Sequence, residues 1–368
     1  MNIHKFANEA IKSSIEFFDS LQMKENFNFL PALEGLTDEG KNLKLGFSTF
    51  GMKMYYMNGE WDKLPSSLQK EWVDFINSFQ KNVDKLPPNS YVDPVIYNFY
   101  NHNNLKKQSK EIVKNALNFL PKYSFDSNEI KFHKAINAET KQAISSLYQV
   151  GFKNYKDYDS VYNTSTSLLS YLKSLDWNKP WTSGAQYASL CVYSKINLDK
   201  NTNDLIEFIN QIVDKDTGSY FTGNPSHSRE VINGAMKVLS GLDWLDCDIH
   251  YPEKLIEYCL SNVPLMEGCD IVDYIYVLYR CTKQTDYRKK DVLQKLNDSI
   301  YQIKELYKDF EKGFSYFKNK SQTHYYGVTI SSGLDTSDIH GTLLCNWGLI
   351  MILDANEVLD AKYKIIKP

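Results

Sequence analysis

Arginine is the residue type that this sequence most clearly lacks. Only three of its 42 basic residues are arginines, namely Arg229, Arg280 and Arg288. Asparagine, isoleucine and tyrosine are abundant instead, a bias that predicts an AT-rich, bacterial genome. Because arginine is the residue that clamps phosphate or carboxylate through two parallel hydrogen bonds, a polyphosphate site in this chain would have to use lysines, helix termini or a metal ion.

Several well-known motifs are also missing. The sequence contains no glycine-rich phosphate loop, Ser-His-Asp hydrolase elbow, HExxH or EF-hand pattern, which argues against nucleotide-dependent and zincin chemistry. No apolar run is long enough to span a bilayer, and the amphipathic first 18 residues lack the apolar core of a signal peptide. The six cysteines show no CxxC spacing, so we expect reduced thiols and a cytoplasmic location.

The overall charge and composition are those of an ordinary globular protein. A net charge of −3 gives no electrostatic footprint for nucleic acid or for an anionic membrane. Hydrophobic residues make up 42% of the chain and charged residues 24%, which argues against disorder. The length of 368 residues fits either two average domains or one large helical domain.

Apolar side chains recur at helical spacing along most of the chain. Residues 1–104 are the less regular part, with a segment at 43–57 that is helix or strand by pattern and a long excursion at 85–104 that we interpret as a covering loop. Residues 105–368 are regular. The predicted helices lie at 5–22, 68–83, 105–120, 136–149, 160–174, 181–195, 202–213, 229–241, 253–262, 268–282, 288–308 and 338–353.

The later helices alternate between two kinds. Charged, amphipathic segments such as 203–213 and 292–308 are followed by segments rich in small, apolar and aromatic residues, such as 229–242 and 339–353. Solvated helices alternating with helices that are apolar on most faces are what an outer and an inner ring require. The sequence therefore predicts an all-α protein, with residues 1–368 forming a single ring of helical hairpins around a central cavity.

Two loops that precede inner helices share a glycine-aromatic signature, DTGSYFTG at 216–223 and EKGFSYF at 311–317. Together with SDIHGTLLCNWGLIMIL at 337–353, the second loop resembles the last repeat of the terpenoid cyclase/protein prenyltransferase superfamily of α/α toroids. The resemblance covers roughly the C-terminal half of the chain. It implies an α/α toroid that acts on a small molecule in an aromatic-lined cavity. Sugar-processing (α/α) barrels use similar rings of hairpins and remain an alternative.

The acidic pair Asp335 and Asp338 stands just before the last apolar helix. The resemblance implies that one of them is the acid that protonates an alkene or epoxide, with His340 as a polar partner. Such an acid must stay neutral, and burial beside another carboxylate raises the pKa in that direction. Capping of the helix that begins at Ile339 explains the same aspartates equally well.

A possible metal site comes from the same resemblance. Glu267, Cys269 and His340 stand where prenyltransferase-type proteins bind zinc through a carboxylate, a thiolate and an imidazole. Three such ligands around an open fourth position suit a catalytic Zn²⁺, which would lower the pKa of a thiol or water. The alternative is a cysteine that is buried for packing and a hydrogen-bonded histidine.

Further candidates lie where other inner helices begin. His227, Glu230 and Asn233 could meet Asp270, Asp273, Asp338 and His340 across the cavity. If the substrate is a sugar, Glu230, Asp270, Asp338 and His340 would share the general acid–base work. The predicted aromatic wall, which could face a carbocation or stack on a sugar ring, consists of Trp181, Tyr187, Tyr220, Tyr274 and Trp347.

The leading functional expectation is therefore a terpene cyclase/prenyltransferase-like enzyme with an isoprenoid substrate. The first alternative is a carbohydrate-active glycosidase, lyase or epimerase. The second is a toroid that binds a ligand without catalysis.

Overall fold

The structure is a computed structural model, and it describes residues 3–23, 27–102, 126–158, 164–197 and 200–368. These residues form 14 α-helices, and their strands are confined to three two-stranded antiparallel pairs. The predicted all-α class is therefore confirmed at the level of a mostly helical chain. None of the described helices is both long enough and apolar enough to cross a membrane.

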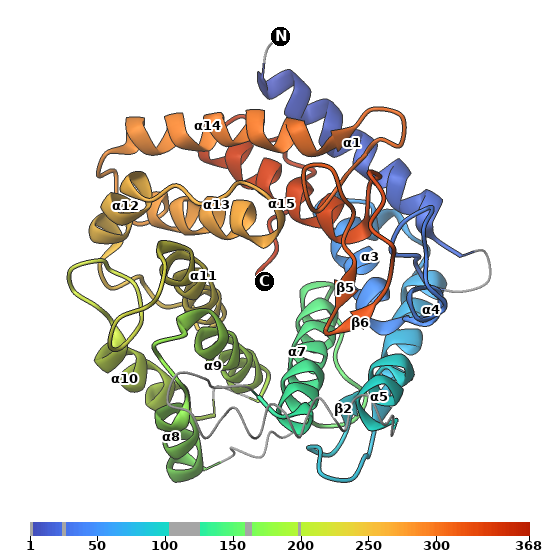
Figure 1. Cartoon of the computed structure of the whole chain (residues 1–368), viewed down its shortest axis with the longest axis horizontal. Helices are drawn as coiled ribbons and strands as arrows, with labels where there is room; N and C mark the ends of the chain where they lie inside the picture. The colour runs from blue at the N-terminus through green and yellow to red at the C-terminus, as the bar shows by residue number, and fades with distance from the viewer. Residues whose placement is uncertain (1–2, 24–26, 103–125, 159–163, 198–199) are drawn as a thin grey trace.

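Six helices that border one central pocket surround the centre of the molecule (Figure 1). Each packs against the next along the chain, and the last packs against the first, so their contacts form a closed order. The C-terminal residue lies near the middle of this arrangement in Figure 1. The six inner helices are α3 (Leu45–Met57), α7 (Asn128–Gln149), α9 (Pro180–Ile196), α11 (Ser228–Trp244), α13 (Gly268–Thr282) and α15 (Ile339–Ala355).

Seven further helices pack on the outside of these six. Helix α1 contacts α15, α4 contacts α3, α5 contacts α7, α10 contacts α9, α12 and α14 contact α13, and α8 contacts α10. The short helix α2 (Asp38–Asn42) and the 3₁₀ turn at Trp61–Lys63 complete the set. The outer helices are α1 (Ile3–Leu21), α4 (Ser66–Asn77), α5 (Pro94–Asn101), α8 (Ser165–Ser174), α10 (Thr202–Ile212), α12 (Pro252–Ser261) and α14 (Lys289–Leu306).

Burial separates the two sets of helices as the sequence pattern predicts. Helix α10 buries Leu205, Phe208 and Ile209, one stripe at helical spacing, and leaves the other face to solvent. Helix α15 buries every residue except His340, Leu344 and Asp354. Of these exceptions, His340 and Leu344 border a central cavity.

The three strand pairs lie in the connections. They are β1 (Gln80–Lys81) with β2 (Ser90–Tyr91), β3 (Tyr307–Lys308) with β4 (Gly313–Phe314), and β5 (His324–Tyr325) with β6 (Val328–Thr329). The hydroxyl of Tyr325 donates a hydrogen bond of 2.8 Å to the buried carboxyl of Glu139 on α7. This bond attaches the β5–β6 hairpin to helix α7.

The structure decides two of the sequence-based predictions for residues 43–83. The segment that could have been helix or strand is helix α3, and its glycines mark close contacts, because a Cβ at Gly46 or Gly51 would collide with the ring of Tyr325 or Phe29. The helix expected at 68–83 ends at Asn77, and strand β1 follows it.

The excursion at 85–104 contains helix α5, which the sequence reading missed. Its signal is Asp93 followed by Pro94, since the Asp93 side chain accepts from the Val95 N–H as an N-cap and proline occupies the first helical position. Helix α7 begins at Asn128, before the expected 136. The helix predicted at 105–120 lies outside the described residues.

Candidate functional site

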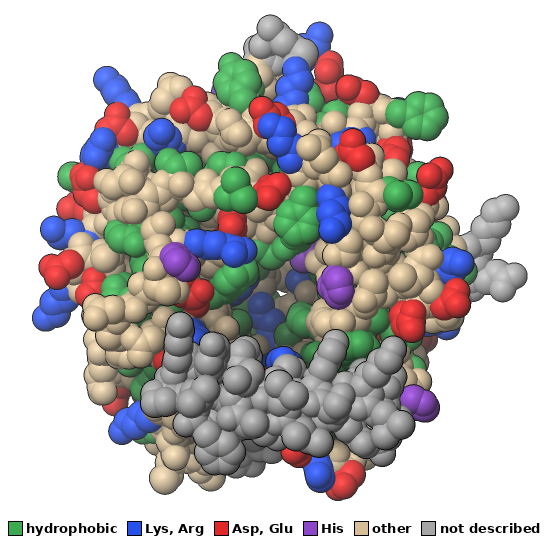
Figure 2. Space-filling view, viewed as in Figure 1, with side chains coloured by type: hydrophobic (Ala, Val, Ile, Leu, Met, Phe, Trp, Pro, Cys, Tyr) green, Lys and Arg blue, Asp and Glu red, His purple; other side chains and the backbone are tan. Residues whose placement is uncertain are grey.

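A cavity of about 420 Å³ lies at the centre, and all six inner helices contribute to its wall. Figure 2 shows the corresponding hollow in the middle of this face of the molecule. The volume is in the range of small-molecule binding pockets. Residues from the connection between β4 and β6, and the segment Ile366–Pro368, close the remaining sides. The six inner helices therefore share one cavity.

The wall is largely apolar and aromatic, and His340 is embedded in it. Its ring stacks on Phe50, with centroids 4.9 Å apart, and lies 5.1 Å from the ring of Tyr316. Burial, together with the nearby Lys237 and Lys53, lowers the pKa of His340 to about 3, so the imidazole is neutral. Its Nδ1 atom is buried without a hydrogen-bond partner among the described residues. His340 is therefore a neutral polar group in the cavity wall.

Three lysines also border the cavity, one each from α3, α7 and α11. Lys53 is only 7% exposed, and burial, then the charge of Lys237, lowers its pKa to about 8. Burial, then the charge of Lys53, also holds the pKa of Lys141 well below its usual value. Lys237 lies 3.8 Å from Oδ1 of Asp273. Within the described part of the chain, neither Lys53 nor Lys141 has a hydrogen bond or an ion pair.

Asp273 is the carboxylate of this wall. It is 1% exposed, and its Oδ2 atom has no hydrogen-bond partner in the residues that the structure describes. Burial raises its pKa to about 6, against the opposing effect of Lys237. A carboxyl group of this kind exchanges its proton near neutral pH, as a general acid must. The sequence reading placed Asp273 among substrate-binding residues, and its environment suits an acid.

Cys269 borders the same cavity, one turn before Asp273. Its Sγ atom lies 3.1 Å from the hydroxyl of Tyr316, and burial raises its pKa to about 11. The group is therefore a thiol rather than a thiolate. Gly268 has a φ of +59°, and a Cβ there would lie 2.7 Å from the ring of Tyr316. Glycine is thus required where the Tyr316 ring packs on the start of α13.

Asp338 caps helix α15 and does not border the cavity. Its Oδ1 accepts from the N–H of Gly341 at 2.8 Å, and its Oδ2 accepts from the N–H groups of Tyr316 and Gln322 at 2.7 and 3.0 Å. Burial raises its pKa to about 6, while these three bonds act in the opposite direction. Asp335, by contrast, has a side chain that is 59% exposed and pairs with Lys308. Asp338 therefore caps α15 through Gly341 and binds the connection between β4 and β6 through Tyr316 and Gln322.

The predicted acids at the starts of α11 and α13 are hydrogen-bonded to groups of neighbouring inner helices. Asp270 accepts from Nε of Arg229 at 2.8 Å and from Nδ2 of Asn233 at 2.8 Å. Glu230 accepts from the backbone N–H of Trp181 at 3.1 Å. These bonds join the first turns of α9, α11 and α13. The helix starts do meet, but their acidic groups bind each other's helices and do not line the cavity. His227 is exposed to solvent.

Of the five predicted wall aromatics, Trp347 borders the central cavity. Tyr187 and Tyr220 are fully buried elsewhere, with their hydroxyls 3.4 Å from the Leu205 carbonyl and 3.1 Å from His250. Tyr274 borders a different surface pocket. The aromatic residues that the sequence reading missed are Phe50, Tyr316, Tyr325 and Tyr326. Tyr316 is the second aromatic residue of the GFSYF motif at 313–317, so this motif was the signal in the sequence that could have identified it as a wall residue.

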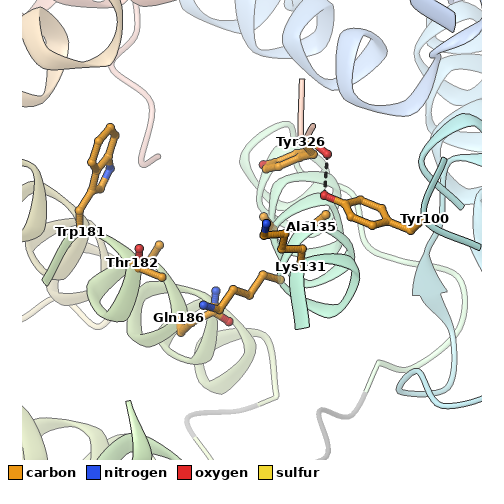
Figure 3. A pocket seen from close by; sticks show the side chains of 10 residues that line it. Tyr100, Lys131, Ala135, Trp181, Thr182, Gln186 and Tyr326 are labelled. Carbon is orange, nitrogen blue, oxygen red and sulfur yellow. Dashed lines mark hydrogen bonds between the residues drawn. The ribbon is translucent and has the colours of Figure 1, made fainter. Parts of the chain in front are cut away.

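Trp181 borders a second cavity of about 410 Å³ between α7 and α9 (Figure 3). Thr182 and Gln186 lie beside it on α9, and Tyr326 lines both this cavity and the central one. The hydroxyl of Tyr100 donates to the backbone oxygen of Tyr326 at 2.9 Å, the bond drawn in Figure 3. The second cavity therefore adjoins the first at Tyr326.

The predicted zinc ligands do not form a metal site. Across the described ranges, no group of three or more His, Cys, Asp or Glu side chains could hold a metal ion. Glu267 accepts instead from the N–H of Lys318 at 3.0 Å. The thiol of Cys269 is bonded to Tyr316, whose ring also contacts His340. The residues present do not fit Zn²⁺, so no step of the chemistry is derived through a metal.

Comparisons with protein-family models, with curated proteins and with solved structures find no match to this chain. Functional assignment therefore rests on the geometry of the cavity.

Proposed function

We propose that this chain is a single α/α toroid and a terpene cyclase-like enzyme that converts an amphiphilic small molecule in its central cavity by protonating an alkene. Two features support the toroid: the closed contact order of the six inner helices, and a cavity that all six border. The observation that carries the chemistry is a single carboxyl group, Asp273, with an unpartnered oxygen in a largely apolar and aromatic wall.

Asp273 is suited to deliver a proton. With a pKa of about 6, a substantial fraction of the group is protonated near neutral pH. In the proposed step, the alkene π pair takes the proton from the carboxyl group, which leaves a carbocation on the substrate and a carboxylate on Asp273. Lys237, 3.8 Å from Oδ1, would stabilise that carboxylate. The new carboxylate and the ammonium group of Lys237 are then adjacent opposite charges in the cavity wall.

The cavity wall is suited to the cation that this step creates. Phe50, Tyr316 and Trp347 present aromatic rings to the cavity. The faces of such rings attract a cation through their quadrupole, by about 0.5–2 kcal/mol each. The thiol of Cys269 and the neutral imidazole of His340 add no negative charge that would trap the cation prematurely.

The carbohydrate-active alternative has less support. Glycosidase chemistry requires two carboxyl groups flanking the scissile bond. Among the described residues, Asp273 is the carboxylate that borders the central cavity. The other predicted acids already have partners. Glu230 accepts from a backbone N–H, and Asp270 accepts from Arg229 and Asn233. Asp338 accepts from three backbone N–H groups.

The test is turnover of polyprenyl substrates by purified protein, with products separated by gas chromatography and mass spectrometry. Farnesyl and geranylgeranyl diphosphate, and the corresponding alcohols, are suitable probes. We expect Asp273→Asn to lower the rate by about 10²-fold or more, because the amide cannot supply the proton. Since the acid must be protonated, the wild-type rate should fall as pH rises above about 6.

Asp335→Asn is the matched control, since this aspartate is exposed and far from the wall, and its rate should equal that of the wild type. Full activity in Asp273→Asn would remove the proposed acid. Binding of the probes without any turnover would instead identify a non-catalytic toroid, and turnover of glycosides with no turnover of isoprenoids would favour the carbohydrate reading.

A further inference from the structure

We propose that Lys53, Lys141 and Lys237 form a binding site for a multiply charged oxyanion, such as a phosphoryl group, on the ligand of the central cavity. The site is assembled from three inner helices, α3, α7 and α11, and each lysine borders the cavity. The inference depends on the proposal that this cavity receives the substrate, and it adds the class of chemical group that the substrate carries.

Two of the three ammonium groups are unpaired in the described part of the chain. Lys53 is only 7% exposed, yet it has no ion pair or hydrogen bond within the described residues. Lys141, which is half-buried, also has no ion pair or hydrogen bond within the described residues, and it reaches the cavity from the neighbouring helix α7. Removing an ammonium group from water without a partner costs several kcal/mol. A ligand that supplies negative charge in the cavity would offset this cost, most of all at the buried Lys53.

Positive side chains outnumber negative ones around the cavity. Three lysines face one carboxylate, so positive charge exceeds negative charge by two when all four groups are ionised. Lys237 already lies next to that carboxylate, Asp273. A ligand with at least two negative charges would therefore neutralise the wall, whereas a singly charged or neutral ligand would not. The other titratable side chains that border the cavity are His340, Cys269, Tyr316, His324, Tyr325 and Tyr326, and the last residue, Pro368, borders it as well.

None of those other groups competes with the ligand as a fixed anion. Burial keeps the Cys269 thiol and the three tyrosine hydroxyls protonated by raising their pKa values, and His340 is neutral. Glu139, two residues before Lys141 on α7, does not border the cavity, and burial raises its pKa well above the usual value. Among the described residues, no titratable side chain of the wall other than Asp273 therefore supplies a negative charge, which favours a ligand that carries one.

Binding at this site should be coupled to proton uptake. In the unliganded protein the pKa of Lys53 is about 8, so this group is partly neutral at pH 8, and burial also holds the pKa of Lys141 well below its usual value. A bound oxyanion stabilises the charged ammonium and raises both pKa values, which draws protons from the buffer. Arrangements of lysines that stay fully charged, such as those on an exposed surface, would show no such uptake.

The experiment is isothermal titration calorimetry of the full chain with inorganic diphosphate at pH 8, in two buffers of different ionisation enthalpy. Succinate is titrated in parallel, to distinguish a phosphoryl group from a dicarboxylate. We expect saturable binding of diphosphate, with an enthalpy that differs between the buffers by the amount that proton uptake requires. Lys53→Gln and Lys141→Gln should each weaken binding about 10-fold or more.

Lys254→Gln is the matched control, because Lys254 is exposed on the outer helix α12. Its affinity should equal that of the wild type. Thermal unfolding of each variant separates loss of the site from loss of the fold, and removal of an unpaired buried charge is expected to leave the fold intact. Tighter binding of succinate than of diphosphate would replace the phosphoryl group with a dicarboxylate at the same lysines.

The proposal is overturned if neither anion binds the wild type, or if both bind the Lys53→Gln/Lys141→Gln double variant equally well. Its failure is distinguishable from failure of the proposed catalysis. An Asp273→Asn variant that still binds diphosphate but shows unchanged turnover would remove the acid and leave the anion site. Loss of diphosphate binding in the lysine variants, with turnover of uncharged isoprenoid alcohols retained, would support both.

Discussion

Charged residues at the starts of the inner helices and charged residues in the cavity wall have opposite surroundings. At the helix starts, Asp338 accepts three backbone hydrogen bonds and Asp270 pairs with Arg229 and Asn233. In the wall, Lys53 and Lys141 have no partner among the described residues, and Asp273 has one oxygen without a hydrogen bond. Asp338, Asp270, Asp273 and Lys53 are all buried, so among these four groups the difference lies in pairing and not in exposure to solvent.

This difference shows which charges hold the fold together. A buried carboxylate whose oxygens accept hydrogen bonds from backbone N–H groups recovers part of its desolvation cost through those bonds. A buried ammonium without partners destabilises the folded chain and is explained by a ligand. The rim acids Glu230, Asp270 and Asp338, named for their place at the helix starts, are therefore structural in this fold. The wall groups are the functional candidates.

The largest expected effect is on the rim. Asp338→Ala removes three hydrogen bonds and leaves the backbone N–H groups of Tyr316, Gln322 and Gly341 without their acceptor. We expect the free energy of unfolding to fall by about 3 kcal/mol or more, since bonds to a charged group are worth about 1.5–3 kcal/mol each. Urea denaturation followed by circular dichroism measures this. A loss below about 1 kcal/mol would show that Asp338 is not the anchor of these loops.

A smaller effect of opposite sign is expected in the wall. Lys53→Met replaces an unpaired buried ammonium by an apolar chain of similar length, and should raise the free energy of unfolding at pH 7 by about 2 kcal/mol. The pKa of Lys53 falls from 10.5 to about 8 on folding, so between these values the unfolded chain binds more protons. Wild-type stability should therefore rise with pH across this window.

The rise should be smaller in Lys53→Met, because the variant has one fewer lysine that titrates differently in the two states. Denaturation series at pH 7 and pH 10 measure it, with Lys254→Met as the control. If Lys53→Met is less stable than the wild type at pH 7, Lys53 has a stabilising partner, and the contrast between rim and wall would fail.

The smallest effect is expected at Asp335, close to Asp338 in sequence. Its side chain is 59% exposed and pairs with Lys308 at the surface. Asp335→Ala should change the free energy of unfolding by less than about 0.5 kcal/mol, as is usual for exposed ion pairs. The same urea titration measures it. A loss comparable to that of Asp338→Ala would mean that the two aspartates act as one unit.

Some of the wall could have been read from the sequence. Lys53 is the one charged residue in the apolar segment 45–57, and Lys237 stands alone in the same way in 231–242. An isolated lysine in a helix that is otherwise apolar on most faces is a signal for a buried charge. Lys141 gave no such signal, because α7 carries polar residues on both sides of it. Asp338 was ambiguous, since an N-cap and an acid have the same local sequence.

The sequence by itself determined that this chain is mostly helical, where most helices lie, and which of them are apolar on most faces. These properties are local, because helix periodicity, caps and glycine turns depend on residues a few positions apart. Only the tertiary structure decided which charged groups meet. Lys53, Lys141 and Lys237 come from three separate helices, and Asp270 and Asp273 on one helix turn to different surroundings. Pairing of this kind depends on how distant helices pack, and no spacing along the chain encodes it.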